Sequence, residues 1–372
     1  MKTRKSLLVL LSALLVFSFN YSCATIISKT LKLTPKENRV TVDKNVMIAT
    51  RDGIHLATDV YRPAADGKFP AVLCRLPYGK NMIGQLGKVF AERGYVFVIQ
   101  DCRATFNSEG DVFIAFVNDE MDGRDTVKWI SGQPWFNGAM AAWGGSYFGY
   151  TQWQVADDNP YLKAFYPLIT TPDMYKAIFT GGAFHYSLAK GWSMGVGKQN
   201  NASSMLTDMV FSKKPKWKPE EALFNKPLQP DLKYSFVELG KMPLEQLSVV
   251  LGLAPADKPM SPYPDAMDKM ISMFTYPGFA YHSPTFNFFD RYKDVKAPAF
   301  MVSGWYDIFL KAQLDDFQIM KKDAPEPAKS GTRIVIGPWG HASLGYKEAD
   351  KTGKTMTMFR DMFDIAWFDF WV

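Results

Sequence analysis

Hydrophobic and polar positions alternate through residues 39–62, RVTVDKNVMIATRDGIHLATDVYR, on both sides of Asp52-Gly53. Alternation with a period of two is typical of strands that bury one face, and Asp-Gly is a frequent hairpin turn. The pattern therefore predicts a β-hairpin. The next segment, FPAVLCRL, is a short and mostly apolar run, which predicts a strand buried on both faces.

Strand-like and helix-like segments alternate from there to about residue 172. GKVFAERGYVFVIQD is typical of a helix, a glycine stop and a buried strand, and NDEMDGRDTVKWISGQ has apolar residues at helical spacing. AMAAWGGS and LKAFYPLIT are further apolar strands, with the helical YFGYTQWQVADD between them. This alternation predicts an α/β fold with a mostly parallel sheet and helices on both faces.

A different composition begins at residue 173. Residues 173–292 are rich in Met, Pro, Lys and aromatics, show no clear strand, and contain helix-like stretches such as MPLEQLSVVLGL. The strand and helix alternation resumes in residues 293–372 with APAFMVSGWYD, IFLKAQLDDFQIMKK and TRIVIGPWGH, and an apolar-rich helix ends the chain. We predict that residues 36–172 and 293–372 form one α/β core and that residues 173–292 are an inserted helical cap.

The first 24 residues, MKTRKSLLVLLSALLVFSFNYSCA, have a basic start and an apolar stretch from Leu7 to Phe19, the layout of a secretory signal peptide. This run of about 13 residues is shorter than the roughly 20 that cross a bilayer as a helix. We therefore expect a periplasmic or secreted protein without a transmembrane span in the mature chain. Ser22 and Ala24 suit ordinary signal-peptidase cleavage, and lipidation of Cys23 is the alternative.

Composition and charge narrow the function classes. Hydrophobic residues make up 47% of the chain, which excludes wholesale disorder. The formal net charge is +6, and the three basic residues of the leader account for half of it. Basic residues do not cluster with aromatics, so no nucleic-acid partner is expected. Cys74 and Cys102 end apolar runs and are predicted to be buried free thiols.

Ser146 lies in a glycine-rich turn, AAWGGSYFGYTQW, between a predicted strand and a predicted helix. Such a turn exposes a nucleophilic hydroxyl at a helix N-terminus, where backbone N–H groups face a developing oxyanion. Gly144 and Gly145 meet the need for small neighbours. Phe148 stands where the usual motif has glycine, which comes one position later at Gly149. The motif alone leaves an ordinary turn serine as the alternative.

A nucleophilic serine needs a base and an orienting acid downstream, in the order Ser, Asp, His. His341 follows the strand RIVIGPW, and Asp307 follows the strand APAFMVSGWY, so both loops lie at the C-terminal edge of the sheet. Taken alone, Asp307 also suits a helix N-cap and His341 an ordinary loop histidine. The other histidines lie in the hairpin or the predicted cap: His55, His185 and His282. Order, strand context and edge together predict a triad of Ser146, His341 and Asp307.

GGSYFGYTQWQ, GWYDIF and IGPWGH resemble the three active-site signatures of the cocaine-esterase-like (CocE/NonD) hydrolases, within the X-Pro dipeptidyl-peptidase-like superfamily. RDGIHLATDVYRP resembles the opening hairpin of that family, and RLPYGK resembles its Pro-Tyr-x-Lys loop. The resemblance covers roughly residues 45–372. It implies an α/β-hydrolase fold and a serine esterase or acylase that needs no cofactor or metal and acts on small esters, amides or short peptides.

The resemblance also implies a role for each site residue. Ser146 would be the nucleophile, His341 the general base and then acid, and Asp307 the residue that orients the imidazole. The Tyr78 hydroxyl and the backbone N–H of Tyr147 would form the oxyanion hole. The alternative for Tyr78 is a core tyrosine with a satisfied hydroxyl.

The segment QDCRATFNSEGD resembles the Asp-x-Arg-Gly segment of the family. We interpret Asp101, Arg103 and Glu109 as a structural ion-pair network without a chemical role. Ala104 and Thr105 depart from the family pattern, and their departure affects the shape of this loop.

Two further features concern the substrate. Relatives that prefer α-amino acyl esters carry carboxylates just ahead of a stretch like FTGGAF, where this chain has Lys176 and Ala177. The difference weakens that preference and favours neutral or anionic acyl groups. Aromatic residues of the predicted cap are candidates to line an acyl pocket, with core packing as the alternative: Phe184, Trp192 and Phe286.

Members of the family commonly continue into a C-terminal jelly-roll domain, whereas this sequence stops at WFDFWV. A fragment, a truncated product and a cleft open on that side are the alternatives. The function predicted from the sequence is an exported serine hydrolase that acts through an acyl-enzyme. An X-Pro dipeptidyl-peptidase, a lipid or polymer esterase and a catalytically idle binding protein are the alternatives, and the sequence does not predict an oligomeric state.

Overall fold

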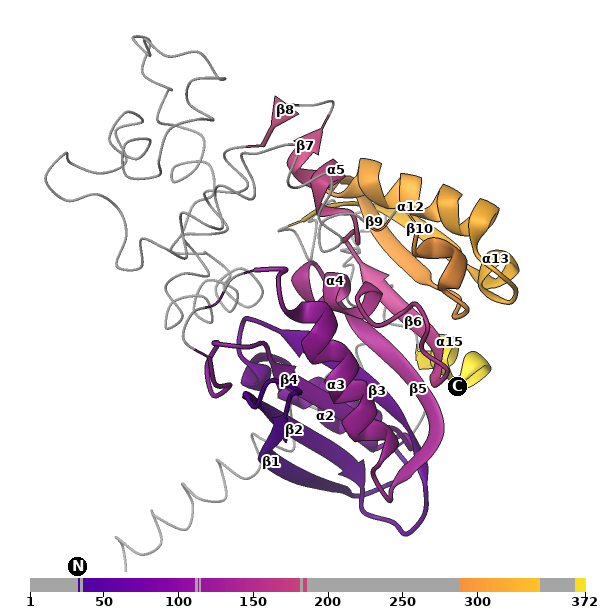
Figure 1. Cartoon of the computed structure of the whole chain (residues 1–372). Coiled ribbons are helices and arrows are strands. Elements are labelled where there is room, and N and C mark those ends of the chain that lie inside the picture. Colours follow the sequence, from indigo (N-terminus) through magenta and orange to yellow (C-terminus); the bar gives the residue numbers. More distant parts are fainter. Residues whose placement is uncertain are drawn as a thin grey trace, which may run out of the picture.

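The computed structural model describes most of the predicted core (Figure 1). The described residues are 33, 36–110, 113, 115–180, 183–185, 288, 290–341 and 365–372. The predicted signal peptide, including Cys23, and most of the predicted cap lie outside them. Within the described part, none of the helices is long and apolar enough to span a bilayer.

Eight strands form one sheet in the order β1-β2-β4-β3-β5-β6-β9-β10. Their bounds are β1 Val40–Ala49, β2 His55–Pro63, β3 Phe69–Leu76, β4 Val96–Asp101, β5 Phe136–Gly145, β6 Leu162–Leu168, β9 Phe300–Tyr306 and β10 Arg333–Gly340. The first two pairings, β1 with β2 and β2 with β4, are antiparallel, and every pairing from β4 to β10 is parallel. The C-terminal ends of β3, β5, β9 and β10 therefore share one edge of the sheet, and the predicted α/β class is confirmed.

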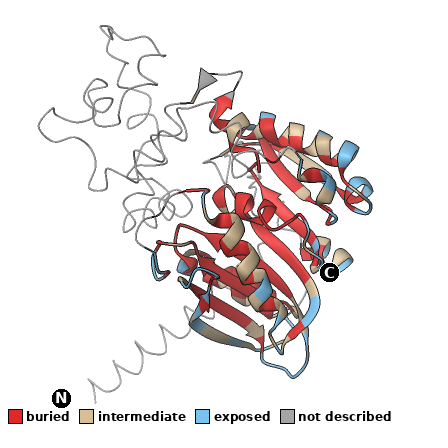
Figure 2. Ribbon diagram, in the orientation of Figure 1, coloured by how far each residue is buried: buried red, intermediate tan, exposed pale blue. Residues whose placement is uncertain are grey.

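Helices cover both faces of the sheet. Their bounds are α2 Gly84–Ala91, α3 Asp119–Ser131, α4 Tyr147–Trp153, α5 Met174–Ile178, α12 Leu310–Asp323, α13 Ala328–Gly331 and α15 Ile365–Trp371, with short 3-10 helices η1 Lys80–Ile83 and η3 Tyr292–Asp294. One core layer holds α2 and α15, where the rings of Phe90 and Phe368 are 6.1 Å apart. The other holds Ile130 of α3 and Met320 of α12. Figure 2 shows the central strands buried between these layers.

The predicted hairpin is confirmed as β1 and β2. The turn residue Gly53 has φ +85°, a left-handed conformation that glycine adopts without steric cost. The Gly53 N–H donates to the Thr50 carbonyl at 3.0 Å, and the Thr50 N–H donates to the Ile54 carbonyl at 2.8 Å. β1 is largely exposed at the sheet edge, whereas β3 is buried along most of its length. The alternating segment thus forms both the edge strand β1 and the buried strand β2, and the continuous apolar run forms the central strand β3.

The predicted cap is described only at its ends. Its first residues form α5 and a small antiparallel hairpin of β7 Phe179–Thr180 and β8 Ala183–Phe184, where no strand was expected. The remainder lies outside the described residues, so the division of the chain into core and cap stays a prediction. Cys74 and Cys102 are buried and free, as predicted.

Candidate active site

Ser146 occupies the turn between β5 and α4 with φ 53° and ψ −125°, a strained conformation for a residue with a Cβ. Close packing explains the glycines around it. A Cβ on Gly144 would lie 2.2 Å from the Phe148 ring and 2.8 Å from the Phe148 carbonyl oxygen. A Cβ on Gly149 would lie 2.5 Å from the Thr170 methyl group. The displaced glycine of the motif is therefore required where α4 approaches the end of β6.

The backbone of Ser146 is fixed by four hydrogen bonds. Its N–H donates to the Leu168 carbonyl at 2.9 Å. Its carbonyl accepts from the N–H groups of Gly149 and Tyr150, both at 2.9 Å, and from Thr170 Oγ1 at 2.8 Å. Thr170 was not predicted from the sequence, although a hydroxyl residue two positions after a buried strand at this edge is a signal for such a contact.

The structure brings Ser146, His341 and Asp307 together across 195 residues of chain. Ser146 Oγ lies 2.9 Å from His341 Nε2, and His341 Nδ1 lies 3.0 Å from Asp307 Oδ2. The His341 side chain is 25% exposed and the Asp307 side chain is fully buried. A hydroxyl, an imidazole and a buried carboxylate thus form one chain of hydrogen bonds that is open to solvent at the imidazole.

Asp307 is not the N-cap of α12, because that position is Phe309 and no side chain caps the helix there. Its Oδ2 faces His341, while its Oδ1 accepts a hydrogen bond from the Phe309 N–H at 2.7 Å, just before α12 begins at Leu310. The carboxylate is therefore held by the turn that leads into the helix. This hydrogen bond to the backbone fixes the orientation of the carboxylate, and therefore the direction in which Oδ2 faces the imidazole of His341.

Trp339 joins the loops that carry Asp307 and His341. Its Nε1 donates to the Ser303 carbonyl at 2.8 Å, and its side chain is buried. A Cβ on Gly304 would lie 2.0 Å from the Trp339 carbonyl oxygen, and a Cβ on Gly337 would lie 2.1 Å from its ring. The register of β9 and β10 shifts at this point, between Gly337 and Gly340. The two glycines thus make room for the indole at the base of the His341 loop.

Tyr78 lies just beyond β3, beside the first turn of α4. Its ring is buried and packs edge-on against Tyr147 and Phe148, with centroids 6.4 Å and 6.3 Å away. The predicted oxyanion-hole residues are therefore neighbours of the nucleophile. Their role in binding an oxyanion stays a prediction.

Asp101, Arg103 and Glu109 each contact a partner from another segment. Ion pairs join Asp101 to Lys80 at 3.0 Å and Arg103 to Asp122 at 2.6 Å and to Asp52 at 2.7 Å, and Glu109 Oε2 is hydrogen-bonded to His55 Nδ1 at 2.9 Å. The Arg103 guanidinium also holds the pKa of Asp52 well below its usual range. Ala104, which stands at the glycine position of the family segment, has φ +56°, a conformation that favours glycine.

Lys176 is paired within the protein. Its Nζ lies 3.2 Å from Asp173 Oδ2, and its backbone N–H donates to Asp173 Oδ1 at 3.1 Å at the start of α5. Burial raises the pKa of Asp173, and the Lys176 charge opposes that rise. The lysine thus faces a carboxylate of its own chain. Of the predicted pocket residues, Phe184 contributes its backbone to β8, and Trp192 and Phe286 lie outside the described residues.

A family model identifies the chain. The model of the X-Pro dipeptidyl-peptidase (S15) family matches residues 52–343, which include Ser146, Asp307 and His341. The chain belongs to the S15 family. The resemblance seen in the sequence motifs is thereby confirmed.

Within the part of the chain that the structure describes, no group of three or more His, Cys, Asp or Glu side chains is arranged so that it could hold a metal ion.

One curated protein and two solved structures illustrate what the chain is similar to. The chain is 32% identical to a cocaine esterase of Rhodococcus sp. (strain MB1 Bresler) over 327 residues, which covers 85% of this chain and 51% of that protein. An α-amino acid ester hydrolase structure matches with a TM-score of 0.54 and 20% identity, covering 91% of this chain and 55% of the other. An aminopeptidase from a marine sediment Thaumarchaeota archaeon matches with a TM-score of 0.50 and 20% identity, covering 84% and 50%.

The two structural likenesses show the α/β-hydrolase fold alone. The chain spans about half the length of the curated relatives that it matches. The fold and the S15 family are therefore properties of this chain, while its activity follows as a proposal.

Proposed function

We propose that this chain is an exported serine hydrolase that cleaves a small acyl ester or amide through an acyl-enzyme. The hydrogen-bonded chain from Ser146 Oγ through His341 to the buried Asp307 carboxylate is the single observation that carries the proposal. Membership of a family of serine hydrolases supports it. Export rests on the basic and apolar leader of the sequence.

The reaction proceeds in two acyl-transfer steps. The Ser146 hydroxyl gives its proton to His341 Nε2 as Oγ attacks the substrate carbonyl carbon, and Asp307 stabilises the imidazolium through Nδ1–H. His341 then protonates the leaving alcohol or amine as its bond to the carbonyl carbon breaks. Water next attacks the acyl carbon and gives its proton to His341. His341 then protonates Ser146 Oγ as the bond between Oγ and the acyl carbon breaks, which releases the acid and restores the hydroxyl. The Tyr78 hydroxyl and the Tyr147 N–H bind the oxyanion in both steps.

The sequence resemblance, which compares Lys176 with acidic residues of relatives that prefer α-amino acyl esters, connects α5 with the acyl group. Because Lys176 is paired with Asp173, we propose that the site takes neutral acyl groups in preference to α-amino or anionic ones. A panel of aryl esters with neutral, amino and carboxylate acyl groups tests this preference. A higher kcat/KM for either charged ester would contradict it.

The first prediction concerns the nucleophile. A fluorophosphonate probe should label the wild-type chain at Ser146, and Ser146→Ala should abolish both labelling and ester hydrolysis. Ser131→Ala is the matched control, because Ser131 is half-buried at the end of α3 and has no role in the proposed chemistry. This variant should be labelled like the wild type. Mass spectrometry of the labelled peptide gives the position. Labelling that persists in Ser146→Ala would assign the reaction to another nucleophile.

A substrate comparison separates the remaining functions. The description of the matched family favours an X-Pro dipeptidyl-peptidase as the second candidate. Hydrolysis of a simple aryl ester without release of a dipeptide from a chromogenic Xaa-Pro amide supports the esterase. The reverse result supports the peptidase. An unlabelled chain that is thermally stabilised by these compounds would instead be a binding protein.

A further inference from the structure

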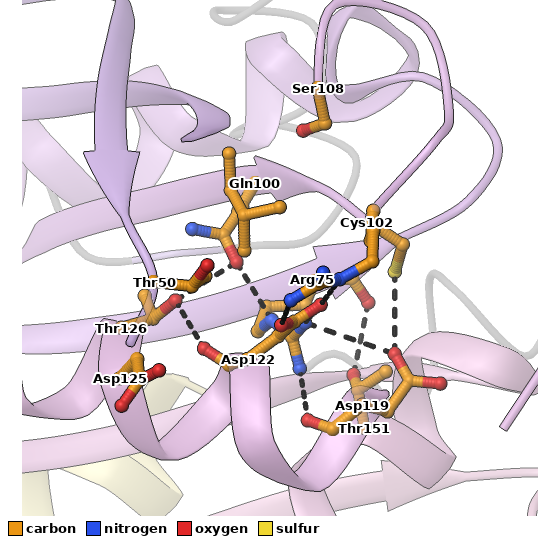
Figure 3. A network of polar contacts seen from close by, with 12 residues as sticks. Thr50, Arg75, Gln100, Cys102, Ser108, Asp119, Asp122, Asp125, Thr126 and Thr151 are labelled. Carbon is orange, nitrogen blue, oxygen red and sulfur yellow. Dashed lines mark hydrogen bonds and ion pairs between the residues drawn. The ribbon is translucent and has the colours of Figure 1, made fainter. Parts of the chain in front are cut away.

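A buried polar network lies directly behind the nucleophile turn and is not used by the proposed chemistry. Arg75 of β3 is only 1% exposed, and Figure 3 shows its side chain directed at Asp119, the first residue of α3. Arg75 Nε donates to Gln100 Oε1 at 2.8 Å, and Nη1 donates to the Asp119 carbonyl at 2.6 Å. A charge buried this deeply is costly unless it is paired. The carboxylates of Asp119 and Asp122 lie 3.8 Å and 3.9 Å from Arg75 Nη2 and pair with it.

The network ends on the residue that follows the nucleophile. The Tyr147 hydroxyl donates to Asp119 Oδ2 at 2.5 Å and accepts from the Phe116 N–H at 2.9 Å. The second oxygen, Asp119 Oδ1, lies 3.8 Å from Arg75 Nη2. Burial raises the pKa of Tyr147 well above its usual range, so its hydroxyl keeps the proton that it donates. The side chain of Tyr147 is thus anchored at its far end.

The same network touches the strand that carries the second oxyanion donor. The Arg75 carbonyl accepts from Thr151 Oγ1 of α4 at 2.9 Å, and Tyr78 follows Arg75 by three positions. The oxyanion hole needs the Tyr78 hydroxyl and the Tyr147 N–H at a fixed separation, although one follows β3 and the other begins α4. Arg75 and Asp119 connect these two elements.

We propose that Asp119, backed by Arg75, is a positioning residue for acyl transfer. By holding the Tyr147 hydroxyl it fixes the rotation of the first turn of α4 and therefore the direction of the Tyr147 N–H. Asp119 does not touch the substrate. This inference rests on the proposed function, because it assigns a part of the oxyanion hole of that same site.

Tyr147→Phe tests the inference, because it removes the anchored hydroxyl and leaves the ring and the backbone N–H. Removing an oxyanion-hole donor lowers kcat by roughly 10²–10³, and displacing one should lower it less. We therefore expect kcat on an aryl ester to fall on the order of tenfold with KM nearly unchanged. The affinity for an arylboronic acid, whose adduct with Ser146 places an oxygen in the oxyanion hole, should fall in proportion.

Tyr150→Phe is the matched control. Tyr150 is also a buried tyrosine of α4, and its hydroxyl donates to the Phe116 carbonyl at 3.4 Å. Tyr150→Phe should keep the wild-type kcat and boronic acid affinity. Tyr147→Phe should also lower the melting temperature more, because its hydroxyl makes the shorter hydrogen bonds. Equal kcat in the two variants would overturn the positioning role, since the Tyr147 anchor would then be structural only.

Asp119→Asn completes a double-mutant cycle. If the two residues act together, the loss of kcat in Asp119→Asn combined with Tyr147→Phe should be no larger than the greater single loss. Losses that multiply would overturn the inference, and if Asp119→Asn fails to fold, the comparison with Tyr150→Phe decides alone. Failure of the probe to label wild-type Ser146 removes the proposed function and this inference together. Normal labelling with an unaltered kcat in Tyr147→Phe removes only the inference.

Discussion

At the residue scale, Tyr78 is the side chain whose role is easiest to isolate. Tyr78→Phe keeps the ring that packs against Tyr147 and Phe148 and removes only the hydroxyl. If that hydroxyl binds the oxyanion, kcat should fall by roughly 10²–10³, about 3–4 kcal/mol of transition-state stabilisation. Steady-state kinetics and circular dichroism are the measurements. A variant that folds and keeps the wild-type kcat would remove Tyr78 from the mechanism.

Ala104 provides a prediction about stability. A residue with a Cβ in the left-handed region costs roughly 1–2 kcal/mol, and glycine costs about 0.5–1 kcal/mol in chain entropy. Because Ala104 has φ +56°, Ala104→Gly should raise the free energy of unfolding by about 0.5–1 kcal/mol.

The control for Ala104 is Ala91→Gly at the end of α2, where the backbone is right-handed helix. This variant should lower the free energy of unfolding. Urea unfolding of both variants is the measurement. Destabilisation of both to the same extent would mean that the Ala104 methyl group contributes packing that outweighs its backbone strain.

The site residues differ in how far the sequence predicts them. Ser146, Asp307 and His341 each follow an apolar strand, so their meeting at one edge follows from the parallel order of the strands. Thr170 contacts Ser146, and Asp119 contacts Tyr147, only because neighbouring elements approach closely. No local pattern encodes such contacts, because the partner of each hydroxyl or carboxylate lies on another element.

At the element scale, the strands were predicted better than the helix ends. FPAVLCRL coincides with β3, since a central strand is specified by its own apolar run. The predicted helix YFGYTQWQVADD ends at Trp153, and the chain then passes through turns in which the Val155 N–H donates to the Gln152 carbonyl at 3.2 Å. Apolar spacing continues through such turns, so periodicity alone does not mark the end of the helix.

The contact between β9 and β10 gives the prediction at this scale. In Gly304→Ala the new methyl group would meet the Trp339 carbonyl oxygen at 2.0 Å, and backbone atoms cannot move aside cheaply. We expect a loss of stability of about 1–3 kcal/mol, typical of overpacking, and a loss of activity because the His341 loop shifts.

Thermal unfolding and ester hydrolysis test the Gly304 variant against Gly94→Ala. A Cβ on Gly94 meets nothing within 4 Å, but its φ of +88° still strains the backbone. Gly94→Ala should therefore lower stability without lowering the specific activity of the folded protein. Equal specific activity in both variants would mean that the Trp339 contact does not align His341.

At the scale of the whole molecule, one buried carboxyl links stability to pH. Burial raises the pKa of Asp316 from 3.8 to about 7, although the Tyr292 hydroxyl donates to it at 2.6 Å. The folded state therefore binds this proton more tightly than the unfolded state. The free energy of unfolding should fall as pH rises between about 4 and about 7, and this loss persists above that range.

Asp316→Asn removes this titration while keeping an oxygen that accepts from Tyr292. The melting temperature of the variant relative to the wild type should therefore be higher near pH 8 than near pH 5, because only the wild type loses its proton between them. Because the two proteins share all other titrating groups, the contributions of those groups to the melting temperature cancel when the two are compared at the same pH. A difference that does not change with pH would mean that Asp316 titrates alike in the folded and unfolded chain.

The arrangement of the triad has a consequence for protein synthesis. Ser146 follows the fifth strand in chain order, whereas His341, its proposed base, follows β10, 195 residues later. Under the proposed mechanism, a nascent chain therefore contains the nucleophile well before its base has been synthesised. We expect hydrolase activity only after β10 has joined the sheet and placed His341 beside Ser146.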